Sequence, residues 1–471
     1  MLSGIQGWSL CVSVILIVWS ILLIRKGPNA ALGASIVLSF VFPVWLEISV
    51  AGVPISIRTA AAILGLLAFL CPPHRMKILS PLTLLDFCIG FMCVAHVISD
   101  SFADALTPSL PFRAYGEWVL PYAAGRFAIR DRKDLQWIAP WVAGLLLFLG
   151  VMSCFESLTR INVFEYAFGD RPVGLADRRA VRFGFKRAFG PTTHPLFFGM
   201  MIVVLMPWLV CLWQSFQSKR ARILTLASGV IAFAGTIFTM SRTPVLTVLA
   251  TIAVTASLRI KVVRWLLALS LMLTVVGFVA FPYEITDEVS RWSGGGDKKR
   301  LVEIDGKAVV SSSSRTRLQV FAIYLRPMIK AGPFGFGSAA TSEFPLSIPS
   351  MQGTYKSSML FEAVDNAYVL LILRFGWVGG ICLALLFLTA IGTGLSVFLD
   401  RSSQLFPGTV ASMFSVFACF SLLLVFMNYD FGLPILWTMG ILSGLASARS
   451  DGGSGSMPGM IKSGVVRNSL K

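Results

Sequence analysis

Long, uninterrupted apolar runs are the feature that most constrains how this chain can fold. The run at residues 8–24, WSLCVSVILIVWSILLI, is one of many, and a helix of such length nearly spans the roughly 30 Å hydrocarbon core of a bilayer. A backbone inside a bilayer must satisfy its own hydrogen bonds, so membrane spans are helices or closed barrels. Barrel strands alternate apolar and polar residues, whereas these runs are continuously apolar. The sequence therefore predicts an all-α, polytopic integral membrane protein.

The runs divide the chain into about 12–13 candidate transmembrane helices, which we expect to form a single transmembrane domain, residues 1–447. The segment 366–398 is long for one span, so we expect it to tilt or break near Gly376. The segment 114–129 is the weakest candidate, because it carries two charged residues. The candidates are 8–24, 30–48, 57–71, 82–98, 114–129, 135–155, 195–214, 222–239, 243–258, 262–281, 366–398, 406–427 and 430–447.

Lysine and arginine in the short loops predict the orientation of the spans. These residues recur between alternate pairs of spans, so they share one face, which the positive-inside bias makes cytoplasmic. The other, extracytoplasmic face then receives a basic loop at 156–194 and a large loop at 282–362. The segment 448–471 is Gly/Ser-rich and basic, and we expect it to form a disordered cytoplasmic tail. The cytoplasmic basic residues are Arg25, Lys26, Arg75, Lys77, Arg130, Arg132, Lys133, Lys219, Arg220, Arg222, Arg259, Lys261, Arg264 and Arg401.

Charge and cysteine usage narrow the possible functions. The formal net charge is +17 although only 13% of residues are charged, and no soluble basic domain is visible. The charge therefore indicates membrane topology and anionic lipid rather than nucleic acid. The eight cysteines lie in or beside apolar runs, so we expect neither a disulfide framework nor a thiolate metal site. There is no phosphate-binding glycine loop, and the three histidines lie on different segments, so we expect no metal and no other cofactor.

The loop 156–194 has many basic residues for an extracytoplasmic segment. Either these charges are merely solvated and orientation is fixed elsewhere, or they form an anion site. Arginine presents a planar donor fork that suits phosphate, which favours the anion site. His194, at the end of the loop, either begins the next span or belongs to that site. The basic residues are Arg160, Arg171, Arg178, Arg179, Arg182, Lys186 and Arg187.

Two more arginines lie on the predicted extracytoplasmic face. Arg242 occupies the tip of the short turn 239–244, where it is either a snorkelling anchor or a functional residue facing the same cavity as the others. Arg315 opens a segment, 315–330, in which Leu318, Phe321, Ala322, Leu325 and Ile329 recur at helical spacing. That spacing predicts an amphipathic helix lying on the membrane or on the helical bundle, ended by Pro333.

Asp365 adds a carboxylate to these arginines. The arginines could hold a pyrophosphate while Asp365 takes a proton from a hydroxyl. Asp365 and Asn366 also begin an apolar helix, and Asp and Asn are preferred N-caps, so Asp365 is either a cap or a base. Without a nucleotide site, the reaction left open is transfer from an activated donor such as a lipid pyrophosphate. Asp86, near the cytoplasmic end of its span, is interpreted as structural or interfacial.

Four stretches together resemble the O-antigen ligase and O-antigen polymerase superfamily, bacterial membrane enzymes that join undecaprenyl-pyrophosphate-linked glycans. They are RAFGPTTHPLFFG at 187–199, SRTP at 241–244, RTRL and AGPFGFG within 315–337, and DNAYVLLILRFGWVGG at 365–380. Each is weak alone, but their order is moderately specific, and the resemblance covers roughly residues 110–400. It implies about a dozen helices with a large periplasmic loop as a lid, and inverting, metal-independent glycosyl transfer.

The resemblance also assigns roles to residues. It implies that Arg187, Arg242 and Arg315 contact the donor pyrophosphate or its sugar, and that Asp365 is the general base. Lipid A-core ligases carry a histidine at the Asp365 position, and an aspartate there looks more like the exopolysaccharide polymerases of the superfamily. Further substrate-binding candidates from the same motifs and loops are Arg182, His194, Arg317 and Asn366.

The predicted function is therefore polymerisation of exopolysaccharide or O-antigen repeat units at the bacterial cytoplasmic membrane. One alternative is a ligase that transfers finished glycan to lipid A-core or to protein. Another is a flippase or transporter of lipid-linked oligosaccharide, which should show inverted repeats and broken helices near the midplane. The expected partners are the lipid-linked donor, an acceptor glycan, membrane lipid, a chain-length regulator and a flippase, but no nucleic acid.

The predicted topology can be tested with reporter fusions. A reporter joined at Gly295, in the large loop, and one joined at Gly453, in the tail, should report opposite faces of the membrane, because an odd number of spans separates them. Activity of a periplasm-specific reporter at Gly295 only is the expected result. Both fusions reporting the same face would contradict the topology.

Overall fold

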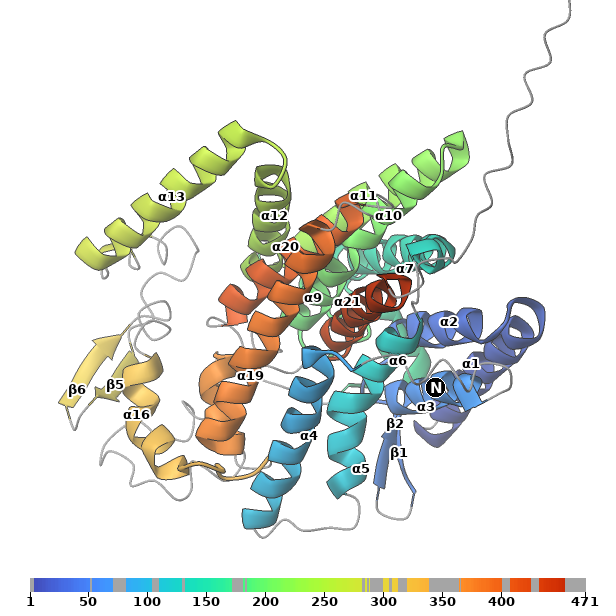
Figure 1. Ribbon diagram of the computed structural model, residues 1–471. Coiled ribbons are helices and arrows are strands. Elements are labelled where there is room, and N and C mark those ends of the chain that lie inside the picture. Colours follow the sequence, from blue (N-terminus) through green and yellow to red (C-terminus); the bar gives the residue numbers. More distant parts are fainter. Residues whose placement is uncertain are drawn as a thin grey trace, which may run out of the picture.

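The computed structural model describes residues 4–50, 53–70, 82–103, 110–128, 132–171, 181–182, 184–281, 284–285, 288, 300–304, 307–311, 320–338, 364, 366–399, 407–424 and 432–453. Most of this part is helical, and the predicted all-α, multi-pass membrane architecture is confirmed (Figure 1). Each predicted span falls on one or more helices. The helices are α1 (Gly4–Lys26), α2 (Pro28–Val41), α3 (Ile57–Leu70), α4 (Leu84–Phe102), α5 (Leu110–Ala114), η2 (Tyr115–Val119), α6 (Leu120–Ala128), α7 (Arg132–Thr159), α8 (Val163–Phe168), α9 (Pro195–Leu205), α10 (Pro207–Ser215), α11 (Lys219–Phe238), α12 (Arg242–Ser257), α13 (Lys261–Ala280), α16 (Val320–Ala331), α19 (Ala367–Leu399), α20 (Pro407–Leu423) and α21 (Gly432–Gly453).

Length and composition identify two groups of apolar segments among these helices. Within the described residues, six helical segments are long and apolar enough to cross a membrane: α1, α4, α7, α9 with α10, α11 and α19. Helices α2, α12, α20 and α21 contribute shorter apolar segments. Helix α21 continues to Gly453, and the predicted division into a transmembrane domain, 1–447, and a cytoplasmic tail stays a prediction.

In the part of the chain that the structure describes, three antiparallel hairpins that the sequence did not predict interrupt the helical pattern. They are β1 (Glu47–Val50) with β2 (Val53–Ser56), β3 (Val181–Arg182) with β4 (Phe185–Lys186), and β5 (Arg300–Ile304) with β6 (Lys307–Ser311). The first hairpin shortens the predicted span 30–48. Helix α2 ends at Val41 because Phe42 precedes a proline and takes the extended conformation that this position favours.

Contacts between distant segments define one end of the helical bundle, which we call the loop end. It collects the C-terminal ends of α2, α4, α7 and α11 and the N-terminal ends of α3, α9 and α12. Three pairs connect these segments: Val44 N–H donating to Pro191 O at 2.9 Å, Thr59 beside Gly116, and His96 beside Glu117 at 3.6 Å. The predicted extracytoplasmic loop 156–194 and the turn 239–244 begin or end here.

The opposite end is closed by a buried polar network around Asp86. The Asp86 carboxylate accepts hydrogen bonds from Tyr122 Oη at 2.7 Å, Arg126 Nε at 3.2 Å and Thr83 Oγ1 at 2.8 Å. Arg126 also donates to Ser447 Oγ at 2.6 Å. The weakest predicted span is therefore helical, in η2 and α6, and its Arg126 is paired inside the bundle, as buried charges must be. The structural interpretation of Asp86 is confirmed.

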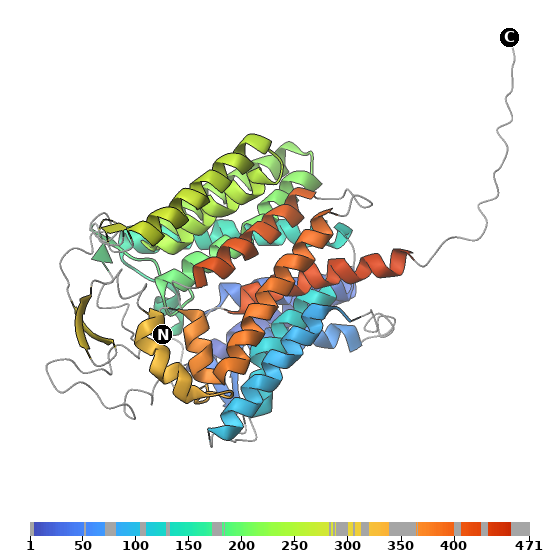
Figure 2. The ribbon, with the colours of Figure 1, turned by 60° about the vertical axis from the view of Figure 1, so that its left-hand side comes forward.

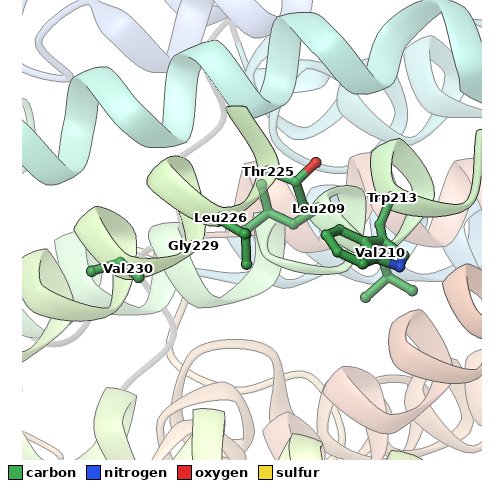
Figure 3. Close-up of a pocket in the computed structure, with 7 residues that line it drawn as sticks. All are labelled: Leu209, Val210, Trp213, Thr225, Leu226, Gly229 and Val230. Atoms are coloured by element: carbon green, nitrogen blue, oxygen red, sulfur yellow. The ribbon is translucent and has the colours of Figure 1, made fainter. Parts of the chain in front are cut away.

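A shallow apolar groove lies between α10 and α11, towards the end opposite the loop end (Figure 3). Its volume is about 390 Å³. The Thr225 hydroxyl at its edge donates to Ala221 O within its own helix, at 2.8 Å. The groove therefore suits an acyl chain of a lipid and offers nothing to a polar substrate. Its lining residues are Leu209, Val210, Trp213, Thr225, Leu226, Gly229 and Val230.

Helix α19 breaks at Phe375 and Gly376, which confirms the break predicted near Gly376. Phe375 has φ −117° and ψ 15°, and Gly376 has φ 67° and ψ −169°, a conformation essentially restricted to glycine. The segment 332–338, which we call the glycine loop, pairs with the chain on both sides of the break. Its four backbone hydrogen bonds are Phe336 N–H to Leu373 O and Gly337 N–H to Arg374 O, both 2.9 Å, Trp377 N–H to Gly332 O at 3.1 Å and Val378 N–H to Pro333 O at 3.2 Å.

The broken helix lies beside α4, and α16 packs on its first half, as both views of the ribbon show (Figures 1 and 2). A side chain at Gly376 would collide with the Pro333 carbonyl, so the glycine loop can approach this closely only because that position has no Cβ. The fold thus fixes where α16, the glycine loop and the start of α19 lie relative to one another.

Replacing Gly376 by alanine tests this arrangement. We expect Gly376→Ala to lose about 1–3 kcal/mol or more of stability, because alanine must adopt a strained backbone and displace the glycine loop. Gly392→Ala, on the same helix with nothing within 4 Å of its added methyl group, should be neutral or slightly stabilising, because alanine has the higher helix propensity. Melting temperatures of the two purified variants in one detergent provide the measurement. Equal melting temperatures would show that the break is not under this constraint.

Candidate functional site

Two segments far apart in the sequence meet at the loop end, and we call their contact the loop–turn junction. One is the segment 181–194 before α9, and the other is the turn 239–242 between α11 and α12. Ala188 N–H donates to Phe238 O at 3.1 Å, which holds the first segment against the end of α11. The structure thus brings together the first two of the four motifs on which the family resemblance rests.

Two arginines of the junction bind the turn. Arg182 Nη1 donates at 2.9 Å to the carbonyl of Met240, whose φ of 50° is uncommon outside glycine. Arg187 donates from Nε to Thr239 O at 3.3 Å and from Nη2 to Ser241 Oγ at 2.9 Å, and only 5% of it is exposed. Its planar fork therefore holds two points of the turn at once. A contact of either arginine with a phosphorylated substrate stays a prediction.

Arg242 and His194 begin helices at the same junction. Arg242 is exposed and is the first residue of α12, where the partial positive charge of a helix N-terminus adds to its own. His194 is the N-cap of α9, and its Nδ1 accepts the Leu196 N–H at 3.1 Å. A neutral His194 therefore carries its proton on Nε2. The interpretation of His194 as the start of a span is confirmed, while substrate contact by either residue stays a prediction.

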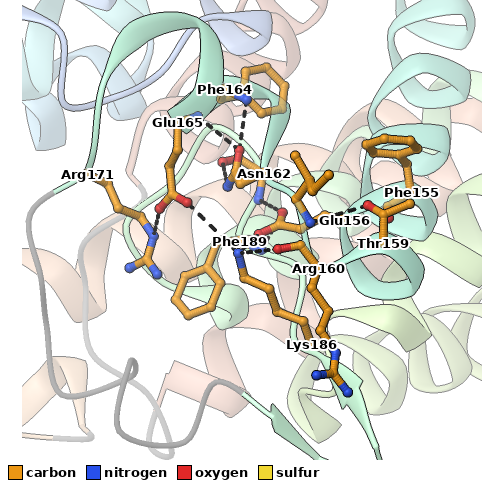
Figure 4. A network of polar contacts seen from close by, with 12 residues as sticks. Phe155, Glu156, Thr159, Arg160, Asn162, Phe164, Glu165, Arg171, Lys186 and Phe189 are labelled. Atoms are coloured by element: carbon orange, nitrogen blue, oxygen red, sulfur yellow. Dashed lines mark hydrogen bonds and ion pairs between the residues drawn. The ribbon is translucent and has the colours of Figure 1, made fainter. Parts of the chain in front are cut away.

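Glu156, at the end of α7, holds the last part of the basic loop in place (Figure 4). Its Oε2 accepts backbone N–H groups from Phe189 at 3.0 Å and Gly190 at 2.8 Å, and its Oε1 lies 3.5 Å from Lys186 Nζ. Asn162 Nδ2 donates to Gly190 O at 3.1 Å, so both backbone polar groups of Gly190 are held. A buried carboxylate with these partners fixes the path of the chain next to Arg187.

Part of the loop's positive charge is paired internally. Arg171 Nε lies 2.7 Å from Glu165 Oε1, and its guanidinium stacks 3.6 Å above the centre of the Phe189 ring. Lys186 Nζ lies 3.9 Å from Glu165 Oε2, in addition to its contact with Glu156. Arg171 is 8% exposed, so the interpretation that the basic residues are merely solvated is wrong for it. Arg171 and Lys186 therefore stabilise the fold of the loop–turn junction, on which the other arginines lie.

The described part of the predicted amphipathic segment 315–330, from Val320 onward, lies in α16, and the predicted apolar stripe is not the side that packs against α19. Tyr324 and Met328 are buried against the start of α19, whereas Phe321, Leu325 and Ile329 are 44%, 46% and 62% exposed. The helix has two apolar sides, and the spacing of apolar residues alone could not show which side is buried.

The end of α16 also differs from the prediction. The helix stops at Ala331 because Gly332 takes φ 60°, the left-handed conformation of a glycine C-terminal cap. Pro333 was expected to stop the helix, but it lies one residue beyond the actual cap.

Asn366 is the N-cap of α19. Its Oδ1 accepts the Val369 N–H at 3.0 Å, and its side chain is fully buried. Leu370 N–H donates to Asn366 O at 3.0 Å, which starts the helical ladder. The capping position considered for Asp365 is therefore occupied by its neighbour. Substrate binding by Asn366 stays a prediction.

Three predicted site residues, Asp365, Arg315 and Arg317, lie outside the described residues. The first is flanked by Val364 and Asn366, both buried against α16 and α19. The other two precede α16 in the sequence. Their roles as base and as substrate contacts stay predictions.

Sequence reasoning missed several polar residues at the loop end. Glu156 ends a span at the base of the basic loop, and an acidic residue beside so many cations was a usable signal. His96 and Asp100 lie on one face of α4 with Nε2 and Oδ2 3.4 Å apart, and their spacing of one helical turn was visible in the sequence. Within the described part, no three His, Cys, Asp or Glu side chains gather closely enough to hold a metal ion.

Comparison with known proteins found one matching family model. A family model described as O-antigen ligase matches residues 227–384, from α11 through the turn 239–242 and α16 into α19. Among curated proteins, no sequence matches the chain. The fold is that of a multi-pass membrane protein, and the members of the matched family are membrane enzymes of the glycosyltransferase type. Over residues 227–384, the match supports the resemblance to the O-antigen ligase and polymerase superfamily.

Replacing Arg187 by lysine tests the loop–turn junction. The ammonium group keeps the charge but cannot donate to both Thr239 O and Ser241 Oγ in the geometry of the fork. We expect Arg187→Lys to lower glycan transfer on the order of tenfold or more at an unchanged protein level. Arg222→Lys, an exposed substitution at the opposite end, should retain full activity. Equal activity of both variants, normalised to membrane protein, would contradict this role.

Proposed function

We propose that the protein polymerises glycan repeat units at the outer face of the bacterial cytoplasmic membrane. The proposed donor is a glycan linked to undecaprenyl pyrophosphate, and the proposed acceptor is a sugar hydroxyl of another lipid-linked glycan. A chain-length regulator and a flippase that delivers the donor are the proposed partners. The family match supports glycan transfer in general, and Asp365 supports polymerisation within that class.

The proposed reaction needs one proton acceptor and one stabilised leaving group. Asp365 takes the proton of the acceptor hydroxyl while its oxygen attacks the anomeric carbon with inversion. The bond between that carbon and the pyrophosphate oxygen breaks, and undecaprenyl pyrophosphate leaves with the electron pair. Arginine side chains stabilise the charge that develops on the pyrophosphate, so the proposal requires no metal ion.

The cap of α19 is the observation that carries this proposal. A helix N-terminus needs one side-chain acceptor at the cap, and Asn366 provides it through the bond to Val369 N–H. The adjacent carboxylate of Asp365 is not required for that purpose. An acidic residue beside a complete cap, in a motif of the matched family, is better explained by chemistry than by helix stability.

The loop–turn junction supports the electrostatic half of the proposal. Arg182 and Arg187 hold the turn from which the exposed Arg242 projects. The turn lies within the segment that the family model matches. An exposed arginine held by a buried, hydrogen-bonded support is the kind of preorganised group that stabilises a leaving phosphate.

The ligase and transporter alternatives are less well supported. The residue at the base position is an aspartate rather than the histidine that lipid A-core ligases carry. A transporter would use the backbone groups freed at a broken helix to bind its substrate or ion. In α19 four such groups, at Leu373, Arg374, Trp377 and Val378, are already bonded to the glycine loop.

Two neighbouring substitutions separate catalysis from capping. We expect Asp365→Asn to fold normally but to lose about 10²–10⁴-fold in rate, because an amide cannot accept the proton. Asn366→Ala should instead lower stability by about 0.5–2 kcal/mol through loss of the cap. Polymer yield, accumulated lipid-linked single repeats and melting temperature are measured for both.

Three outcomes decide the proposal. Loss of polymer with accumulation of single repeats in Asp365→Asn supports it, and partial activity of Asp365→Glu would agree. Near-normal polymer in Asp365→Asn would remove Asp365 as the base. A wild-type membrane that transfers finished glycan to lipid A-core without extending it would favour the ligase.

A further inference from the structure

Helix α16, the glycine loop and the first half of α19 form one structural unit, which we call the site unit. It has its own small apolar core, separate from the main core of the bundle. Val364, next to Asp365 in the sequence, is buried in this core and is only 3% exposed. The position of this unit therefore determines where Val364 and Asn366, the sequence neighbours of Asp365, lie. The core residues are Val320, Tyr324, Met328, Val364, Val369, Leu370, Ile372 and Leu373, with Phe336 packed against them.

Asp100, near the end of α4, joins the site unit to the rest of the bundle. Its Oδ1 accepts the backbone N–H of Ser338, and its Oδ2 accepts the Ser338 hydroxyl at 2.7 Å. Both oxygens are thus used on the last residue of the segment 332–338. Beside it, Ser99 Oγ donates to Arg374 O at 2.6 Å, which binds α4 to the break itself.

The carboxylate of Asp100 is held in turn by His96. Trp118 Nε1 donates to His96 Nδ1 at 3.3 Å, so Nδ1 is the accepting nitrogen and the proton of a neutral imidazole lies on Nε2. Nε2 lies 3.4 Å from Asp100 Oδ2, and Glu117 lies 3.6 Å from Nδ1. His96 and Asp100 are 0% and 2% exposed. A buried carboxylate with these partners has one orientation available, towards the glycine loop.

The glycine loop fits against α4 in a single register. Gly337 has φ 88°, and a Cβ at this position would lie 2.8 Å from Ala103 Cβ and 3.2 Å from Asp100 Oδ1. Phe334 stacks on Phe102 with ring centres 4.7 Å apart and planes 6° from parallel. A loop this close to α4 cannot slide by one residue without losing both carboxylate bonds.

We propose that Asp100, oriented by His96, is a positioning residue that anchors the site unit for glycan transfer. It acts through Ser338 and touches no substrate. Donor contacts from the loop–turn junction lie on other elements, so releasing the anchor displaces the base more than it displaces those contacts. This inference rests on the proposed function for its link to catalysis, while the anchor itself can be tested without it.

The experiment combines labelling with kinetics. Phe336→Cys places a thiol on the glycine loop, and its modification by a membrane-impermeant maleimide is followed with Asp100 intact, in Asp100→Ala and in Ser338→Ala. We expect labelling to rise severalfold in both variants, because the loop leaves the unit's core. The parent protein, which keeps Phe336, measures background from the native cysteines. Ser101→Ala, whose hydroxyl bonds only within α4 to Val97 O, is the matched control and should not change labelling.

The same substitutions are then assayed in protein with Phe336 intact. With purified enzyme and lipid-linked repeat units, Asp100→Ala should lower kcat at least about tenfold and change the donor KM less than about threefold. Asp100→Asn keeps an oxygen that can accept the Ser338 N–H, so it should retain part of the wild-type kcat. If Asp100→Ala does not fold, Asp100→Asn takes its place in both measurements. The kcat of the double variant Asp100→Ala with Ser338→Ala should be no lower than that of Asp100→Ala alone, because both substitutions break the same contact between Asp100 and Ser338.

Each outcome has a distinct meaning. Increased labelling with reduced kcat supports the inference. Unchanged labelling in Asp100→Ala overturns the anchor, whatever the activity. Increased labelling with unchanged kcat overturns its link to catalysis while leaving Asp365 to its own test. If the intact enzyme does not polymerise the repeat units, the proposed function fails, and the labelling result still decides the anchor.

Discussion

A helix that breaks inside a membrane protein frees backbone groups that water cannot reach, and this constraint organises the region around α19. Each unsatisfied group would cost several kcal/mol in hydrocarbon, so the chain must supply partners. The glycine loop does so with four backbone bonds, and it can approach because Gly335 and Gly376 have no side chains. Once the loop is docked, α16 and the start of α19 have fixed positions. The break therefore fixes the relative positions of the elements that form the candidate site.

Buried charge performs a similar function at the loop–turn junction. Glu156 and Glu165 pair with Lys186 and Arg171, and Glu156 also fixes the peptide at Gly190. The carboxylates offset the repulsion among the loop's cations and set its backbone path. Some arginines of the loop thus stabilise the structure, while the turn that they hold carries the exposed Arg242. A basic loop can be both scaffold and binding surface, provided that different members do the two tasks.

The sequence predicted what depends on local pattern. Continuous apolar runs gave the helices, and a span too long for a bilayer gave the break near Gly376. It identified the start of α19 but did not choose between Asp365 and Asn366 as cap, because both residue types cap well. Helix α16 is apolar on two sides, so spacing did not reveal that Tyr324 is buried and Phe321 exposed. The Asp100–Ser338 contact joins residues 238 positions apart, and no local pattern encodes such a pair.

The exposed side of α16 has a consequence for where the enzyme ends and the membrane begins. Tyr324 and Met328 face protein, while Phe321, Leu325 and Ile329 form an apolar stripe on the opposite side. Such a stripe suits the boundary between headgroups and acyl chains. With lipid against this stripe, α16 would lie between α19 and the membrane. Bilayer thickness and headgroup packing would then act on the same helix that shapes the candidate site.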